Sequence, residues 1–198
     1  MDGNIYKIIQ IGTQTWMAEN LKTTRYNDGS DIPDVTGDVE WMDLTTGAYC
    51  WYNNQETTYK NTYGALYNWY SVNTGKLCPT GWHVPSKEEW MILATYLGGV
   101  DLAGGKLKES GTTHWQSPNT GATNTTEFTA LPGGVRDVSS DFGGFFINLG
   151  SNGFWWSSNP GIEPTDHSLK LDSNSGKFSF VPWWIYYNSG ISVRCLKD

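Results

Sequence analysis

The stretch that decides the fold reads Cys78-Pro79-Thr80-Gly81-Trp82-His83-Val84-Pro85-Ser86-Lys87-Glu88-Glu89-Trp90. Ser86 and Glu89 have the S-x-x-E spacing of a capping box, in which the serine oxygen accepts from the N3 amide and the glutamate reaches back to the N-cap. The apolar stripe that follows ends at the paired glycines 98–99, and its members are Trp90, Leu93, Ala94 and Leu97. The pattern predicts an amphipathic helix over about 86–97.

Other segments predict a second helix and several short strands. Tyr63, Leu66, Tyr67 and Tyr70 recur at spacings of three and four, which favours a helix over about 62–73. Ile5–Ile11 alternates as a strand does, and Thr15–Leu21 is predicted as another strand. After residue 100 the helical periodicity disappears, and strands are expected near 153–157, 168–171, 178–181 and 192–196. The sequence therefore predicts one α+β domain over 1–198, with two helices packed on short antiparallel strands and long loops.

Composition excludes several classes of protein. The 198 residues include 11 Trp, 11 Tyr and 7 Phe, but only 17% are charged and the net charge is -7. Disordered acidic chains lack aromatic residues, and long helical proteins are rich in Ala, Glu, Lys and Leu. No basic cluster indicates nucleic-acid binding. The longest apolar run, Phe180–Tyr187, is too short to cross a membrane. The first 15 residues have no leader pattern, so we expect either that the protein is not exported by that route or that the chain begins after a removed leader.

No motif indicates catalysis. His83, His114 and His167 lie outside every zinc-binding spacing, and there is no nucleophile elbow, P-loop or dinucleotide fingerprint. The paired glycines at 98–99, 104–105, 133–134 and 143–144 are interpreted as turns and close-packed backbone. We therefore expect a protein that is not an enzyme and carries no metal or cofactor.

Cysteine usage leaves two alternatives. Cys50, Cys78 and Cys195 are an odd number, so at least one has no partner within the chain. One possibility is three buried thiols. The other is a bridge between Cys78 and Cys195, which would close a long loop and stabilise the fold by about 4 kcal/mol.

Several segments, taken together and in order, resemble a known family. They are Asp2-Gly3-Asn4-Ile5-Tyr6-Lys7, Trp16-Met17-Ala18-Glu19-Asn20-Leu21, Tyr63-Gly64-Ala65-Leu66-Tyr67-Asn68-Trp69-Tyr70, Cys78–Trp90, Ala130-Leu131-Pro132-Gly133-Gly134, Trp156-Ser157-Ser158 and Ser192-Val193-Arg194-Cys195-Leu196. The chain resembles the Fibrobacter succinogenes major paralogous domain, a family of secreted and surface proteins common in Bacteroidetes and Fibrobacteres. The resemblance covers nearly the whole chain and is weakest at about 159–189.

The resemblance implies a C-type lectin-like fold, in the variant shared with formylglycine-generating enzymes. It implies a disulfide between Cys78 and Cys195. Residues 100–194 hold no cysteine, so the cysteine-pair chemistry of those enzymes is not expected. Calcium-dependent sugar binding is not supported by motif, because Trp156-Ser157-Ser158 lacks the acidic ligand and Glu163-Pro164-Thr165-Asp166 follows that strand in the wrong order.

The segment that departs most from the family carries the predicted ligand-binding residues. Phe178 and Phe180 alternate with small residues and are predicted to be core. The run from Trp183 to Tyr187 cannot face one way on a strand, because neighbouring side chains point to opposite faces. Some of these rings should therefore be exposed as a binding platform. The predicted ligand-binding residues are Trp183, Trp184, Tyr186, Tyr187, Asn159, His167, Lys170 and Asp172.

These observations predict a non-catalytic ligand-recognition domain, an adhesin or receptor-binding domain whose loop-built surface at about 154–190 binds a glycan or protein on a cell surface. The expected location is extracellular or at the cell surface. One alternative is a variable protein of a diversity-generating retroelement, with residues 154–190 hypervariable, for which a phage virion is the other expected location. A second alternative is a structural domain of a cell-envelope protein.

Overall fold

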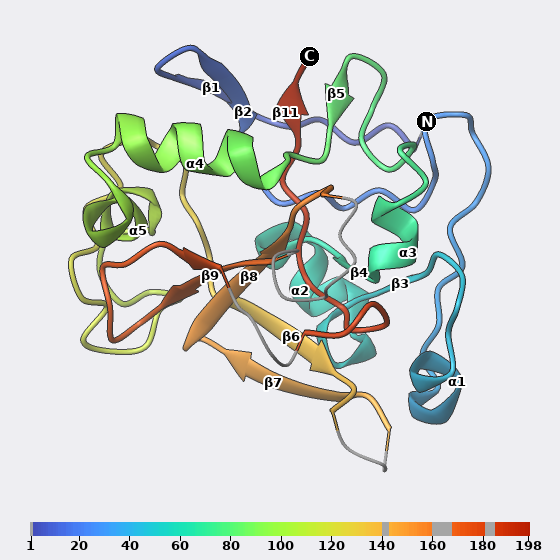
Figure 1. The fold of residues 1–198 in the computed structure, drawn as a ribbon. Helices are drawn as coiled ribbons and strands as arrows, with labels where there is room; N and C mark the ends of the chain where they lie inside the picture. Colours follow the sequence, from blue (N-terminus) through green and yellow to red (C-terminus); the bar gives the residue numbers. More distant parts are fainter. Residues whose placement is uncertain (1, 140–142, 160–167, 181–184) are drawn as a thin grey trace.

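The computed structural model describes residues 2–139, 143–159, 168–180 and 185–198 (Figure 1). Its helices are α1 (Asp38–Met42), α2 (Glu56–Tyr63), α3 (Trp69–Val72), α4 (Lys87–Tyr96) and α5 (Val100–Leu107), with a 3-10 turn η1 (Tyr52–Asn54). Its strands are β1 (Ile8–Ile11), β2 (Gln14–Met17), β3 (Tyr49–Cys50), β4 (Leu66–Tyr67), β5 (Trp82–His83), β6 (Gly133–Asp137), β7 (Phe145–Leu149), β8 (Asn152–Trp156), β9 (Ser168–Asp172), β10 (Ser179–Phe180) and β11 (Leu196–Lys197).

One four-stranded antiparallel sheet joins the two ends of the chain. Its strand order is β1-β2-β11-β5, so the last strand lies between the N-terminal hairpin and the strand that leads into α4 (Figure 1). A disulfide between Cys78 and Cys195, with Cα atoms 6.0 Å apart, fastens the same region. The predicted bridge is therefore confirmed, and Cys50 is a buried free thiol.

A three-stranded antiparallel sheet, in the order β10-β9-β8, separates two clusters of apolar side chains. On one face Phe154 and Trp156 pack in a cluster with Tyr67. On the other face Trp155, Leu169 and Leu171 pack with Trp90 of α4. Because side chains alternate along a strand, β8 fills both clusters at once, and all five of its residues are buried.

The capped helix forms as predicted. The Ser86 Oγ accepts from the Glu89 N–H, and the Glu89 carboxylate accepts from the Ser86 N–H at 2.8 Å. The four residues of the predicted stripe are buried. Gly98 and Gly99, both with φ of +96°, end the helix, as expected of paired glycines after an apolar stripe.

The predicted helix over 62–73 is wrong. The chain instead forms the end of α2, strand β4 and the short helix α3, so the aromatic spacing comes from three elements. Gly64 separates the first two at φ +75°, where a Cβ atom would lie 2.6 Å from the Leu21 carbonyl oxygen. Asn68 then caps α3 by accepting from the Ser71 N–H. Local hydrogen bonds and a close backbone approach therefore override the periodicity.

Helix α5 and strands β6 and β7 form where the sequence pattern predicted no regular structure. Helix α5 contains Gly104 and Gly105, which have low helix propensity. A Cβ on Gly104 would lie 2.3 Å from the Lys177 carbonyl oxygen, and one on Gly105 would lie 2.2 Å from that of Gly121. The glycines are required because two loops pack directly on the helix backbone. This agrees with the interpretation of the paired glycines at 104–105 as close-packed backbone.

A buried polar network ties four distant segments together. The Asn20 Oδ1 accepts from the Arg194 guanidinium at 2.7 Å and from the Trp155 Nε1 at 2.8 Å. Its Nδ2 donates to the Tyr63 carbonyl at 2.9 Å and to the Ser192 hydroxyl at 3.2 Å. One amide side chain thus uses both ends to connect the N-terminal segment, α2, β8 and the residues that lead into β11.

The glycines of α5 predict that replacing glycine by alanine destabilises this helix, although the same change usually stabilises one. Gly→Ala within an ordinary exposed helix adds about 1 kcal/mol of stability. Gly105→Ala should instead lower the free energy of unfolding by roughly 1–3 kcal/mol, because the new methyl group overlaps the Gly121 carbonyl. Urea denaturation measures the change. Leu102→Ala, at an exposed position of the same helix, should stay within about 0.5 kcal/mol of the wild type. A stabilised Gly105→Ala variant would contradict this packing.

Candidate functional site

The predicted ligand-binding residues divide into those that the structure describes and those that it does not. Trp183, Trp184 and His167 lie outside the described residues. The remaining five form three groups: Tyr186 with Tyr187, Asn159 alone, and Lys170 with Asp172. Among the described parts of the chain, no hydrogen bond, ion pair or ring contact given by the structure joins one group to another.

The tyrosine pair follows a buried anchor. Ile185 is buried in the cluster of Phe154 and Trp156. The Tyr187 ring stacks on the Trp69 ring, with centroids 4.6 Å apart and planes 26° apart, and its carbonyl accepts from the Trp69 N–H. Tyr186 lies between these two fixed residues and exposes 44% of its surface. The ring of Tyr186 is therefore presented to solvent by a backbone that is held on both sides.

The residues after the tyrosines are fixed as well. The Asn188 carbonyl accepts from the buried Trp41 Nε1 at 2.7 Å, and its side-chain amide donates to the Met42 carbonyl. Gly190 exchanges two backbone hydrogen bonds with Arg136 of β6. The backbone that follows Tyr186 is therefore fixed by Trp41, Met42 and Arg136. A fixed backbone loses less conformational entropy when a ligand binds.

Asn159 caps the beginning of α4. Its Oδ1 accepts from the Lys87 N–H, and its Nδ2 donates to the Glu88 carboxylate at 3.0 Å. The hydrogen bond from Asn159 lowers the pKa of Glu88. The Lys87 ammonium also lies 5.3 Å from the centre of the Phe180 ring. The residues that directly precede 160–167 and 181–184, Asn159 and Phe180, therefore both contact Lys87, the first residue of α4.

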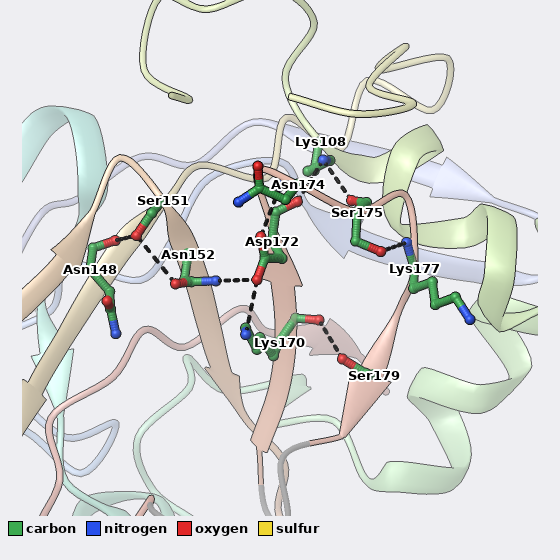
Figure 2. A network of polar contacts seen from close by, with 10 residues as sticks. All are labelled: Lys108, Asn148, Ser151, Asn152, Lys170, Asp172, Asn174, Ser175, Lys177 and Ser179. Atoms are coloured by element: carbon green, nitrogen blue, oxygen red, sulfur yellow. Dashed lines mark hydrogen bonds and ion pairs between the residues drawn. The ribbon is translucent and has the colours of Figure 1, made fainter. Parts of the chain in front are cut away.

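Lys170 and Asp172 face the same side of β9 and form an ion pair of 3.0 Å (Figure 2). Asn152 of β8 donates to the Asp172 carboxylate at 3.0 Å, and the Asn174 N–H donates to its other oxygen at 2.8 Å. Burial alone would raise the pKa of Asp172, but the Asn174 N–H and the Lys170 ammonium outweigh it and lower the pKa. These two predicted residues thus satisfy each other and brace the end of the sheet.

A buried lysine holds the turn beside this pair. The Lys108 ammonium donates to the carbonyls of Thr120, Asp172 and Ser175 at 3.0, 2.8 and 2.9 Å, which uses all three of its protons. Figure 2 shows Lys108 beside Asp172 and Ser175. The ammonium also lies 5.1 Å from the centre of the Trp115 ring. Burial lowers its pKa from 10.5 to about 8, against the opposing effect of the Asp172 charge. This lysine fixes the backbone that leads from β9 to β10.

The metal-ligating side chains and the free thiol are the first groups to consider for reactivity among the described residues. No group of three His, Cys, Asp or Glu residues within the part of the chain that is described could hold a metal ion. Burial raises the pKa of the Cys50 thiol to about 12, so this thiol is protonated and enclosed at neutral pH. The tyrosine loop supplies an exposed aromatic ring on a fixed backbone, which suits binding through shape and stacking.

The structure divides the segment 154–190 into core and surface. Phe154, Trp155 and Trp156 are fully buried, and Leu169, Leu171 and Phe178 are almost so. The prediction that Phe178 belongs to the core is confirmed, while Phe180 is only partly buried. Any diversification of this segment is therefore confined to positions outside the strands' buried faces.

Sequence reasoning missed two residues of the tyrosine group. Trp69 appears in the sequence only as part of a segment that resembles the family, and it is the stacking partner of Tyr187. Tyr70 had been placed on a helical stripe, and its ring lies edge-on to Tyr187 with centroids 6.2 Å apart. The adjacent pair Trp69-Tyr70 was the available signal, because neighbouring large rings on a short element cannot both enter one core.

These elements define a class: a disulfide-bonded domain of mixed α and β structure, with small antiparallel sheets, few helices and an aromatic loop. The chain matches the model of the Fibrobacter succinogenes major domain over residues 9–197, and it belongs to that family. No curated protein and no solved structure matches it significantly. Within the described ranges, the helices are all too short or too polar to cross a bilayer.

Lys108 gives a prediction about pH. Its folded pKa of about 8 lies below the value of 10.5 for an unperturbed lysine, so between these values the unfolded state binds more protons. The stability of the wild type relative to Lys108→Met should therefore rise as the pH increases from about 8 to 10.5. Chemical denaturation at several pH values measures the difference. The variant should also be less stable throughout, because three carbonyls lose their donor. A difference independent of pH would contradict the assignment.

Proposed function

We propose that this domain is a non-catalytic ligand-recognition module, an adhesin or receptor-binding domain with a C-type lectin-like fold. Three features support the fold. The last strand, β11, pairs beside the N-terminal hairpin, the Cys78–Cys195 bridge fastens it, and α4 begins directly after β5. Long loops then occupy the second half of the chain, where such a fold would place its binding surface.

The single observation that carries the proposal is the setting of Tyr186. An exposed aromatic ring normally loses conformational freedom on binding, but here Ile185 is buried, Tyr187 is stacked on Trp69, and the Tyr186 N–H is held by the Ser189 hydroxyl at 3.0 Å. Rigid binding surfaces present large rings on a fixed backbone in this way. Because the backbone is ordered before the ligand binds, binding costs less conformational entropy.

The chemistry favours a ligand with flat apolar faces and hydroxyl groups, such as a glycan, or an exposed protein loop. Tyr186 would stack on the apolar face, and Trp183, Trp184, Asn159 and His167 would supply further rings and polar groups. Lys170 and Asp172 form an ion pair with each other, so we expect them to contribute little to ligand binding. The disulfide is compatible with the extracellular or cell-surface location that this function requires.

An array of bacterial and eukaryotic surface glycans, combined with binding to intact cells, tests the proposal. Tyr186→Ala should weaken binding about fivefold or more, since aromatic hot spots contribute more than about 1 kcal/mol. Tyr186→Phe should retain most of the binding because it preserves the ring face. Trp183→Ala and Trp184→Ala should weaken binding in the same assay.

Ile92→Ala is the matched control, because Ile92 is an exposed apolar residue on α4, outside both proposed surfaces. It should bind as the wild type does. Binding that survives Tyr186→Ala, Trp183→Ala and Trp184→Ala, or a domain that binds no glycan and no cell, would refute the proposed surface. Circular dichroism and thermal unfolding show whether each variant is folded.

A further inference from the structure

A groove of about 660 Å³ runs beside β1, away from the tyrosine loop. It is lined by the five consecutive residues Ile8–Gly12, by the end of α4 at Tyr96, by Lys106 and by the loop Thr125–Glu127. Successive strand residues point to opposite faces. The groove is lined by every residue of β1 in turn. It therefore lies along the edge of this strand, where the backbone is accessible.

The hydrogen bonding shows which backbone groups face the groove. The Ala18 N–H donates to the Lys7 carbonyl at 2.8 Å. Lys7 and Ala18 therefore face each other at a hydrogen-bonded position of the β1–β2 ladder. Such pairs alternate, so Ile9 and Ile11 turn their N–H and C=O groups towards β2. The groups of Ile8 and Gln10 point to the other side, and no partner for them occurs in the part of the chain that is described.

This edge lacks the features that usually protect a strand from pairing. β1 is the outermost strand of its sheet, and its four residues, Ile8–Ile11, include no proline and no charge. Ile8 exposes 58% of its surface. An exposed apolar edge strand is a ready template for another strand.

The far wall of the groove is preorganised. Asn124, Glu127 and Thr129 all adopt left-handed backbone conformations, with φ of +49°, +57° and +51°, which costs energy for residues other than glycine. Asn124 holds the loop by accepting from the Thr129 N–H and donating to its hydroxyl. The Thr126 hydroxyl donates to the Lys106 carbonyl at 3.0 Å. The wall is therefore fixed before anything binds.

Charge indicates what would bind. The Lys106 ammonium donates to the Leu97 carbonyl at 2.9 Å. Glu127 is exposed, and within the described ranges its carboxylate has no ion-pair partner. The domain as a whole has a net charge of -7. An unpaired carboxylate on the wall of a negatively charged domain is complementary to a segment that carries lysine or arginine.

We propose that β1 is a docking edge for an extended peptide segment of a partner protein, with apolar and basic side chains in alternation. The segment would pair with the N–H and C=O groups of Ile8 and Gln10. Its apolar side chains would contact Ile8 and the Tyr96 ring, and a basic side chain would reach Glu127.

A displayed library of random ten-residue peptides tests this proposal. Peptides enriched on the wild-type domain should alternate apolar residues with Lys or Arg. Gln10→Pro removes the N–H that faces the groove and leaves the ladder to β2 intact, so the enriched peptides should bind about tenfold more weakly. Gln10→Ala, which keeps that N–H, is the matched control and should bind normally. Glu127→Gln should weaken the basic peptides several-fold.

A measurement on the wild type keeps the test decisive if Gln10→Pro fails to fold. On adding a synthetic enriched peptide, the amides of Ile8 and Gln10 should gain protection from hydrogen exchange, whereas those of Ile9 and Ile11 are protected already. No enrichment, binding without this protection, or binding unchanged in Gln10→Pro overturns the proposal. So does a dimer in sedimentation analysis that Gln10→Pro abolishes, since the occupant would then be a second copy. Tyr186→Ala should leave peptide binding unchanged, which separates this surface from the tyrosine loop.

Discussion

The contact between Asn20 and Arg194 is the constraint on which the rest of this structure depends. Arg194 is fully buried, and in the described part of the chain no carboxylate contacts its guanidinium group; the Asn20 oxygen, the Phe128 carbonyl and the Phe128 ring hold it instead. Burial lowers the pKa of Arg194, because an enclosed charge is costly. Removing Asn20 would leave this charge and the Trp155 N–H without their acceptor, so both ends of the chain depend on one amide.

This arrangement separates stability from recognition. The disulfide, the Asn20 network and the two clusters on either side of β8 and β9 fix the scaffold without the exposed side chains of the loops. The tyrosine loop is attached at its base through Trp41, Trp69 and Arg136, and Tyr186 projects beyond these contacts. A surface residue of this kind can change with little effect on folding, whereas its neighbours Ile185 and Tyr187 cannot.

Local signals in the sequence predicted what local interactions determine. The capping box of α4 was predicted correctly because Ser86 and Glu89 satisfy each other within one turn. The predicted helix over 62–73 was wrong because the chain needs a glycine at position 64. The carbonyl of Leu21, 43 residues earlier, leaves no room there for a side chain. Helix α5 was missed because its glycines are explained only by loops at Gly121 and Lys177. The disulfide followed from the resemblance to the family, and the stacking of Trp69 on Tyr187 required the folded chain.

The two proposed surfaces use different parts of the chain for binding. The tyrosine loop would recognise a ligand through a side chain, so its specificity can change by substitution while the backbone stays fixed. The edge of β1 would bind through backbone groups, which no single side-chain substitution other than proline removes. Three of the other edges are managed differently: β5 and β10 are only two residues long, and the free side of β8 is covered by the backbone of Ser192. A scaffold that shortens or covers these edges, yet leaves the apolar edge of β1 beside a fixed groove, has a physical reason to accept a strand there.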